Sequence, residues 1–260
     1  MICYVKCMIS PGQFFVKCSL SPGGTGISRE GMIFFDLKHT IMFFLSRIKR
    51  NTGIMEVIYY MRNYYPLTAA QKMHHNWILD YGTQQVSGVS VVASVQAELD
   101  FGLLKKCIQM ETERSGCTRV RFTKPDKDGN VKQYIEKQDS RDIELKDLSG
   151  MESLAKADEL MQQWAYETFD GDNIPMCEFI MLKLPEGYNG FFLHMDHRLI
   201  DSCGLVVMIE DLFQLYTHYR YGTACPQELV DFETVLKKDL AKAGNEKRFA
   251  KDKKFWDDQL

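Results

Sequence analysis

The 260-residue sequence lacks a long uncharged apolar run and an excess of charge of one sign. Its most apolar stretch, residues 32–48, contains Asp36, Lys38 and Arg47, so it is too short and too charged to cross a bilayer. No secretory signal is evident. The formal net charge is only −3, which gives no electrostatic attraction to nucleic acid or to an anionic membrane. We therefore expect neither as a partner.

The sequence also lacks paired cysteines. The eight cysteines are scattered, with no C-x-x-C pair and no histidine at ligand spacing. This excludes the usual zinc motifs and a disulfide framework, and it favours a cytoplasmic protein with reduced thiols and no bound metal. The cysteines are Cys3, Cys7, Cys18, Cys107, Cys117, Cys177, Cys203 and Cys225.

The composition is that of a globular protein, with 45% hydrophobic and 26% charged residues. Residues 1–30 are punctuated by Pro11-Gly12 and by the run SPGGTG at 21–26, too often for long elements, and residues 31–62 hold one or two apolar stretches with basic residues between them. We expect residues 1–64 to be a leader of unassigned role, either loosely attached to the following domain or an extension unrelated to its fold.

From residue 65 onward the pattern is regular. Helices are expected at 69–79, 100–113, 153–169 and 205–219, and strands at 89–99, 118–123, 131–135, 176–184 and 191–193. Thr68 is placed to cap the first of these helices. The order of elements predicts an α/β domain with a mixed β-sheet covered by helices, because hairpins interrupt the alternation of strands and helices.

The stretch FFLHMDHRLIDSCG at 191–204 joins the last expected strand to the last of these helices. Ser202 stands just before the helix and can accept from its free backbone N–H groups. His197 and Asp201 fall in the turn, where rigid supports can hold a general base. An H-x-x-x-D pattern arises easily by chance, so its context has to support this role.

Other residues near the turn have alternative interpretations. Cys203 is either a nucleophile or a small residue packed at the helix start, and we favour packing. His194 should face away from His197 by strand alternation and is expected to be packed. His74 and His75 are expected on a helix surface. Asp196 can raise the pKa of the His197 imidazole, which would weaken it as a base.

Three stretches in order resemble condensation domains of nonribosomal peptide synthetases. YPLTAAQ at 65–71 is similar to the family's Y-P-L-S-x-x-Q, and ERSGCTRVRF at 113–122 to its R-H-E-x-L-R-T-R-F segment. DHRLIDSCG at 196–204 is similar to H-H-x-x-x-D-G, with His197 at the second histidine and Asp201 at the aspartate. KFWDDQL at 254–260 resembles the Y-W-x-x-x-L that closes the segment between two lobes.

The resemblance implies a chloramphenicol acetyltransferase-like fold, with residues 65–222 as the N-terminal lobe and 223–260 as the start of a crossover to a missing second lobe. It implies an acyltransferase that joins a thioester-bound acyl or peptidyl donor to an amine or hydroxyl acceptor. His197 would be the general base, with Asp201, Arg119, Ser202 and Gly204 as structural support and Asp201 paired with Arg119.

The implied partners are an acyl or peptidyl carrier protein and the C-terminal lobe or another subunit. No cofactor is bound permanently, since the donor is carried on phosphopantetheine or coenzyme A. Two departures leave alternatives open: Asp196 replaces the first histidine of the motif and Ser202 its glycine. The alternatives are a fragment without activity that only docks a carrier protein or lobe, a heterocyclisation-like variant with the D-x-x-x-x-D spacing, and copies that associate to complete a site.

Overall fold

The computed structural model describes the backbone of residues 3–9 and 12–16, and residues 62–139, 141–169 and 171–259. The chain divides into two compact units, one formed by Met1–Leu20 with Tyr64–Leu260 and the other by Ser21–Asn63. All of the elements given below belong to the first unit. The predicted leader at 1–64 lies partly outside the described residues.

The main sheet has six strands within the described residues, in the order β2-β1-β4-β9-β8-β7. β7 and β8 are parallel and the other neighbouring pairs are antiparallel, so the sheet is mixed, as predicted. Gly88 at the start of β4 pairs with Asp196 at the end of β9. The strands are β1 (Cys3–Ile9), β2 (Gly12–Val16), β4 (Gly88–Gln96), β7 (Glu144–Asp147), β8 (Cys177–Lys183) and β9 (Tyr188–Asp196).

A smaller sheet of three strands in the described part of the chain has the order β3-β6-β5. Its strands are short and antiparallel: β3 (Tyr65–Pro66), β5 (Val120–Phe122) and β6 (Lys132–Ile135). The 3₁₀ turn Gly116–Arg119 leads into β5. Through β6, this small sheet therefore links β5 to β3, the strand just before α1 (Ala69–Tyr81).

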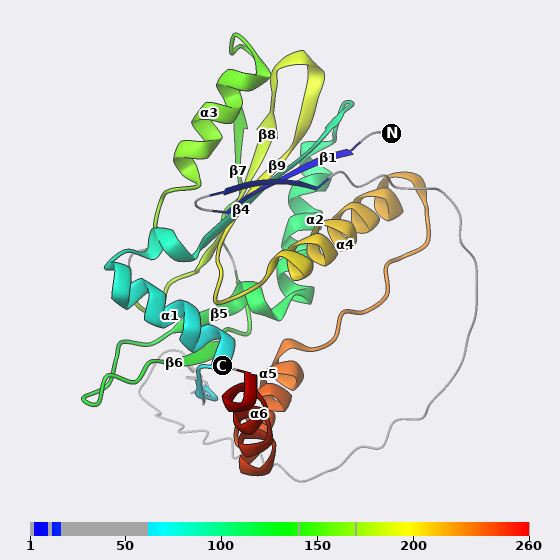
Figure 1. Ribbon diagram of the computed structural model, residues 1–260. Helices are drawn as coiled ribbons and strands as arrows, with labels where there is room; N and C mark the ends of the chain where they lie inside the picture. The colour runs from blue at the N-terminus through cyan, green and yellow to red at the C-terminus, as the bar shows by residue number, and fades with distance from the viewer. Residues whose placement is uncertain (1–2, 10–11, 17–61, 140, 170, 260) are drawn as a thin grey trace, which may run out of the picture. The chain divides into compact units, whose positions relative to one another are not determined.

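Helices cover both faces of the main sheet (Figure 1). α2 (Phe101–Arg114) and α4 (Ser202–Tyr221) lie on one face, and α3 (Leu154–Trp164) lies on the other. The remaining helices are α1 (Ala69–Tyr81), α5 (Phe232–Ala243) and α6 (Glu246–Gln259). Two short 3₁₀ turns lie at Gln84–Ser87 and Pro185–Gly187.

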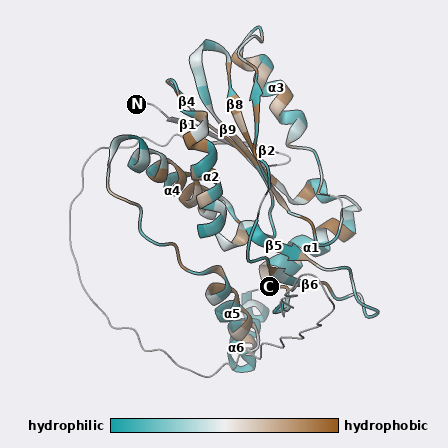
Figure 2. Ribbon diagram, turned by 180° about the vertical axis from the view of Figure 1, so that it is seen from behind, coloured by the Kyte–Doolittle hydropathy of each residue, from teal (hydrophilic) through white to brown (hydrophobic). Residues whose placement is uncertain are grey.

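The core lies in two layers because the central strands bury both of their faces. The larger layer holds Val89, Val91, Phe191 and Leu193 against α2 and α4, and the smaller layer holds Phe192 with its neighbours against α3. Figure 2 shows brown, hydrophobic ribbon along these central strands. Apolar side chains removed from water on both faces of β4 and β9 supply the main driving force for the fold. Because β9 is fixed in this core, the residues that follow it, from 197 onward, start from a rigid position.

The observed elements differ from the predicted ones in informative places. β4 spans Gly88–Gln96 and buries Ser90 and Ser94 as well as its valines, since helices cover both faces of the sheet. β1, within the predicted leader, pairs with β4 as a strand of the sheet. The predicted strand at 118–123 is a 3₁₀ turn followed by only three strand residues. Among the described helices, none has the length and apolarity required to span a membrane.

Candidate active site

The loop from β9 to α4 is anchored to the main sheet through its backbone. The amide of His197 donates to the carbonyl of Ser87, just before β4, at 2.6 Å. The amide of Asp196 donates to Met176 O at 2.9 Å, and Leu199 N donates to Asp196 O at 2.9 Å. These bonds fix the backbone on both sides of His197, so the direction of its side chain is set by the sheet.

A buried ion pair between Asp196 and Arg198 lies within the β9–α4 loop. Nε of Arg198 donates to Oδ1 of Asp196 at 2.9 Å, and Nη2 donates to Oδ2 at 2.8 Å. The side chains are 5% and 2% exposed, respectively. The guanidinium also lies 4.2 Å above the ring of Phe122 in β5. Two parallel N–H···O bonds to one carboxylate are geometrically specific, so this pair holds the turn in one conformation.

Asp196 is thus a structural residue of the loop. Its Oδ1 also accepts from the backbone N–H of Arg198 at 2.8 Å and from the Ser87 hydroxyl at 3.3 Å. Both of its oxygens therefore accept from Arg198, and Oδ1 also accepts from Ser87. The predicted effect of Asp196 on the His197 imidazole stays a prediction, and the pair with Arg198 was not predicted.

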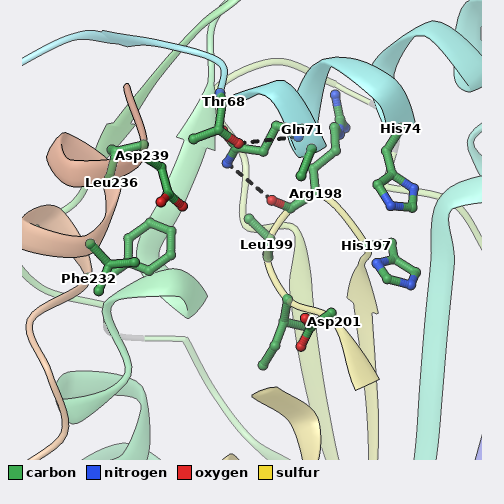
Figure 3. A pocket seen from close by; sticks show the side chains of 13 residues that line it. Thr68, Gln71, His74, His197, Arg198, Leu199, Asp201, Phe232, Leu236 and Asp239 are labelled. Carbon is green, nitrogen blue, oxygen red and sulfur yellow. Dashed lines mark hydrogen bonds between the residues drawn. The ribbon is translucent and has the colours of Figure 1, made fainter. Parts of the chain in front are cut away.

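His197 is half-buried and lines a cavity of about 250 Å³. Within the described residues its ring nitrogens have no hydrogen-bond partner, so both remain available to a substrate. Its ring stacks on that of His74 in α1, with centroids 4.3 Å apart and planes inclined by 18°. Figure 3 shows the two imidazoles one above the other at the side of the cavity.

The cavity lies between α1, the β9–α4 loop and α5. Its wall combines apolar side chains with Gln71, which joins α1 to the loop by donating to the Arg198 carbonyl at 3.1 Å (Figure 3). Gln71 also exchanges hydrogen bonds with Gln133 of β6. The remaining lining residues are Thr68, Ala70, Leu199, Ile200, Asp201, Phe232, Val235, Leu236 and Asp239. The site therefore offers a pocket of mixed lining, with apolar side chains from the loop and α5 and an imidazole at one side.

Asp201 is the N-cap of α4. Its Oδ1 accepts from the backbone N–H of Gly204 at 2.8 Å, and the side chain is otherwise exposed. A carboxylate here also lies at the positive end of the helix dipole. Ser202 is the first residue of the helix, so the predicted capping by Ser202 is wrong: Asp201 performs it. A Cβ on Gly204 would lie 2.7 Å from Cγ1 of Ile200, which explains a glycine at that position.

The predicted pair of Asp201 with Arg119 is also wrong. Arg119 lies in the 3₁₀ turn rather than on a strand, and its guanidinium donates to the carbonyls of Thr112, Glu113, Glu136 and Lys137. Two of these carbonyls belong to the end of α2, and the other two belong to the residues after β6. Arg119 is therefore a clamp between α2 and the residues after β6.

The other arginines of the matched segment are likewise structural. Arg114 makes two hydrogen bonds to Asp211 of α4, at 2.8 and 3.0 Å. Arg121 is buried and donates to Asp139 at 3.0 Å, where Arg141 also binds. Neither Arg114 nor Arg121 lines the cavity.

His194 faces away from the cavity, as strand alternation predicts. It is 2% exposed, its Nδ1 lies 2.7 Å from the hydroxyl of Ser90, and its Nε2 lies 3.0 Å from the carbonyl of Glu167. Nε2–H donation to that carbonyl leaves Nδ1 to accept from Ser90. Burial lowers the pKa of His194, so it is a neutral, packed histidine.

The sequence interpretation missed His74. It was assigned to a helix surface, yet only 9% of it is exposed and it lies against His197. No local signal on the helix reveals this contact, because the partner is 123 positions away. His75 is half-buried, with Nδ1 3.5 Å from Nη1 of Arg198.

Cys203 is exposed at the start of α4 and is not among the residues that line the cavity. In the described ranges no group of three or more His, Cys, Asp or Glu side chains is arranged to hold a metal ion. Of the side chains that line the cavity, His197 carries an imidazole whose ring nitrogens have no hydrogen-bond partner among the described residues, and such a ring can take up a proton.

Comparisons with known proteins place this arrangement in a family. The model of the Condensation domain matches residues 61–260. Surfactin synthase subunit 1 of Bacillus subtilis (strain 168) is 24% identical over 211 residues, covering 76% of this chain and 6% of that protein. A linear gramicidin synthase of Brevibacillus parabrevis is 26% identical over 162 residues, covering 60% of this chain and 2% of that protein.

Solved structures show the same fold. The starter condensation domain of rhizomide synthetase RzmA superimposes with a TM-score of 0.66 at 16% identity, covering 76% of this chain and 48% of that one. A variant of it in complex with C8-CoA gives 0.67 at 17% identity, with 74% and 44% covered. The first condensation domain of the calcium-dependent antibiotic synthetase gives 0.65 at 17%, with 77% and 49% covered.

This chain spans about half the length of these solved domains and a small part of the two synthases. The matched region includes α1, the β9–α4 loop and the cavity between them. The chain belongs to the condensation domain family of nonribosomal peptide synthetases, a family of acyltransferases.

Proposed function

We propose that this chain supplies the general base of a condensation-type acyl transfer, with His197 as that base. The observation that carries the proposal is the position of the His197 ring. It is half-buried at the side of the cavity, its backbone is fixed by the sheet, and its ring nitrogens have no hydrogen-bond partner in the described part of the chain. A base must be able to reach the proton that it removes.

In the reaction, His197 accepts a proton from the N–H or O–H group of the acceptor as that atom attacks the carbonyl carbon of a donor thioester. The new C–N or C–O bond forms, the C–S bond breaks, and the thiolate leaves and takes up a proton. No acyl-enzyme forms, which agrees with the absence of a cysteine or serine from the described lining of the cavity. Base catalysis of this kind contributes about 10²- to 10⁴-fold in rate.

The rest of the site positions the base and the substrates. The Asp196–Arg198 pair fixes the turn, Asp201 starts α4 behind it, and Gln71 joins the loop to α1. Apolar residues of α5 form the opposite wall of the cavity. Holding donor and acceptor together in such a wall supplies the remaining rate enhancement.

The donor is a thioester of phosphopantetheine or coenzyme A, and an acyl or peptidyl carrier protein delivers it. The proposal is supported by the relatives, which are peptide synthases, and by the C8-CoA complex of the RzmA starter domain. The second lobe of a condensation domain, or another subunit, would complete the channel.

The proposal is tested by measuring amide formation from an acyl-coenzyme A donor and an amino acid ester with the 260-residue chain. We expect His197→Ala to reduce kcat by about 10²- to 10⁴-fold. His218→Ala is the matched control, because His218 lies near the exposed end of α4 and bonds the carbonyl of Thr223. A measurable rate that is equal in the wild type and in His197→Ala would contradict the proposal, and no rate in the wild type would favour the docking module described next.

A carrier-docking module without turnover is the second candidate. It is favoured by two departures at the turn: Asp196 in place of a histidine, and Asp201 without a guanidinium partner among the described residues. Binding of an acylated carrier protein to the chain with no amide formed, and unchanged binding by His197→Ala, would support docking over catalysis.

A further inference from the structure

His74 meets His197 from a different part of the chain. It lies in the second turn of α1, which begins at the Thr68 cap, and its ring points down onto the His197 ring (Figure 3). The two rings are nearly parallel, with an interplanar angle of 18°. Trp77, one helical turn later, contacts His74 edge-on at 4.9 Å. His74 is therefore held between an indole and the candidate base.

The contact matters because His197 lacks the usual means of orienting a catalytic imidazole. In most such sites a carboxylate or carbonyl holds the second ring nitrogen and fixes the plane of the ring. The nearby carboxylates are engaged elsewhere: Asp196 binds Arg198, and Asp201 caps α4. Within the described residues, the aromatic contact of the His197 ring is the stack on His74.

The surroundings of His74 keep it neutral. Burial is the main cause that lowers its pKa, and the neighbouring His197 and Arg198 add to this, while Asp196 opposes it. Its Nδ1 is buried without a hydrogen-bond partner. The tautomer with its proton on Nε2 leaves only a lone pair unsatisfied at Nδ1, which costs less than a buried N–H without an acceptor.

We propose that His74 is a positioning residue for His197: its neutral ring fixes the plane of the base by stacking and presents a π face to the imidazolium that forms when His197 takes up a proton. This inference rests on the proposed role of His197 as the base. A cation within about 6 Å of an aromatic ring centroid is attracted to its face, and the rings here lie at 4.3 Å. The stack therefore holds the ring of the base in one plane while the proton is transferred.

Stacking by a neutral ring predicts that another aromatic side chain can replace His74. We expect His74→Phe to keep kcat within a few-fold of the wild type and His74→Ala to lower it by about 10- to 100-fold with little change in KM, because the ring of the base then loses its support. Met73→Ala is the control, since Met73 is the neighbouring residue on α1 and is 46% exposed.

The second readout needs no turnover. In ¹H–¹⁵N or ¹H–¹³C spectra of histidine-labelled chain, the His197 ring signals are identified by their loss in His197→Ala. A ring stacked on another is shifted upfield by its ring current. We expect this shift to be lost in His74→Ala and kept in His74→Phe, while Met73→Ala leaves it unchanged.

The outcomes separate the two proposals. Unchanged His197 signals in His74→Ala, or a wild-type rate in that variant when His197→Ala has lost its rate, would overturn the role of His74 alone. Equal impairment of His74→Ala and His74→Phe would also overturn it. A wild-type rate in His197→Ala would overturn the proposed function, and the spectra would then show whether the stack exists apart from catalysis.

Discussion

Two pairs of a carboxylate and a guanidinium, one buried and one partly exposed, hold this molecule in different ways. Asp196 and Arg198 are two residues apart and close a single loop, whereas Asp211 and Arg114 are 97 positions apart and join α4 to α2. Both arginines make two hydrogen bonds to their carboxylate. The first pair fixes a turn beside the cavity, and the second fixes the packing of two helices behind it.

The surroundings of the two pairs also differ. The Arg198 side chain is 5% exposed, whereas that of Arg114 is 21% exposed and also donates to the carbonyl of Gln227. The helix pair has a third member, Glu111, which is fully buried and accepts from the hydroxyl of Ser115. Loss of one partner from the buried Asp196–Arg198 pair should therefore lower the free energy of unfolding strongly. The Arg114–Asp211 pair is partly exposed to water and lies beside a further acid, Glu111.

The largest expected effect comes from breaking the loop pair. Asp196→Ala leaves the Arg198 guanidinium buried without its carboxylate, which should cost about 3–5 kcal/mol of unfolding free energy in a urea titration. Asp211→Ala should cost less, because Arg114 can reach water. Equal decreases in unfolding free energy for Asp196→Ala and Asp211→Ala would contradict this difference between the two pairs. Restoration by Asp196→Leu combined with Arg198→Met would confirm the unpaired charge as the cause.

The helix pair should show its own pH dependence. Burial, and then the neighbouring Asp211, raise the pKa of Glu111 to about 9 from an ordinary value of 4.5. Between these pH values the folded chain therefore holds more protons than the unfolded chain. The free energy of unfolding should fall as pH rises through this window, by up to about 1.4 kcal/mol per pH unit.

Glu111→Gln should remove this slope, since the amide is neutral at every pH. The measurement is the urea midpoint of the wild type and the variant at several pH values from about 5 to about 8.5, inside the window in which the folded and unfolded chains differ in bound protons. A slope retained in Glu111→Gln would assign the pH dependence to another group.

The smallest effect is expected at Asp201. As an N-cap it should contribute about 1 kcal/mol, so Asp201→Ala should lower the unfolding free energy by about that amount and Asp201→Asn by much less. A partner of a buried arginine would behave differently, with Asn as damaging as Ala. Comparison of the two variants in thermal unfolding therefore distinguishes a cap from an ion pair.

The sequence predicted the parts of the fold that depend on local pattern. The mixed sheet, the Thr68 cap of α1 and the inward-facing His194 follow from alternation and from the side chains that cap helices. β7 was missed because its four residues form an edge strand with exposed side chains and carry no apolar signal. The local sequence pattern was therefore sufficient to predict helices and strands whose buried side chains recur at regular spacing.

The pattern could not choose between tertiary partners. Arg119 was assigned to Asp201, but the carbonyls at the end of α2 lie closer to it. His74 looked like a surface residue because a polar side chain on a helix carries no sign of a partner 123 positions away. The Asp196–Arg198 pair was within reach of sequence reasoning, since opposite charges two residues apart in a turn can close on each other.

The central place of β9 has a consequence for the motions of the loop that follows it. β9 is hydrogen-bonded on both edges, to β4 and to β8, and its residues are buried on both faces. Amide protons in such a strand exchange with solvent only when the whole domain opens. We therefore expect the loop that bears the imidazole to be joined to a slowly exchanging strand, and we expect the amides of α6, which has no buried residue, to exchange faster than those of β9.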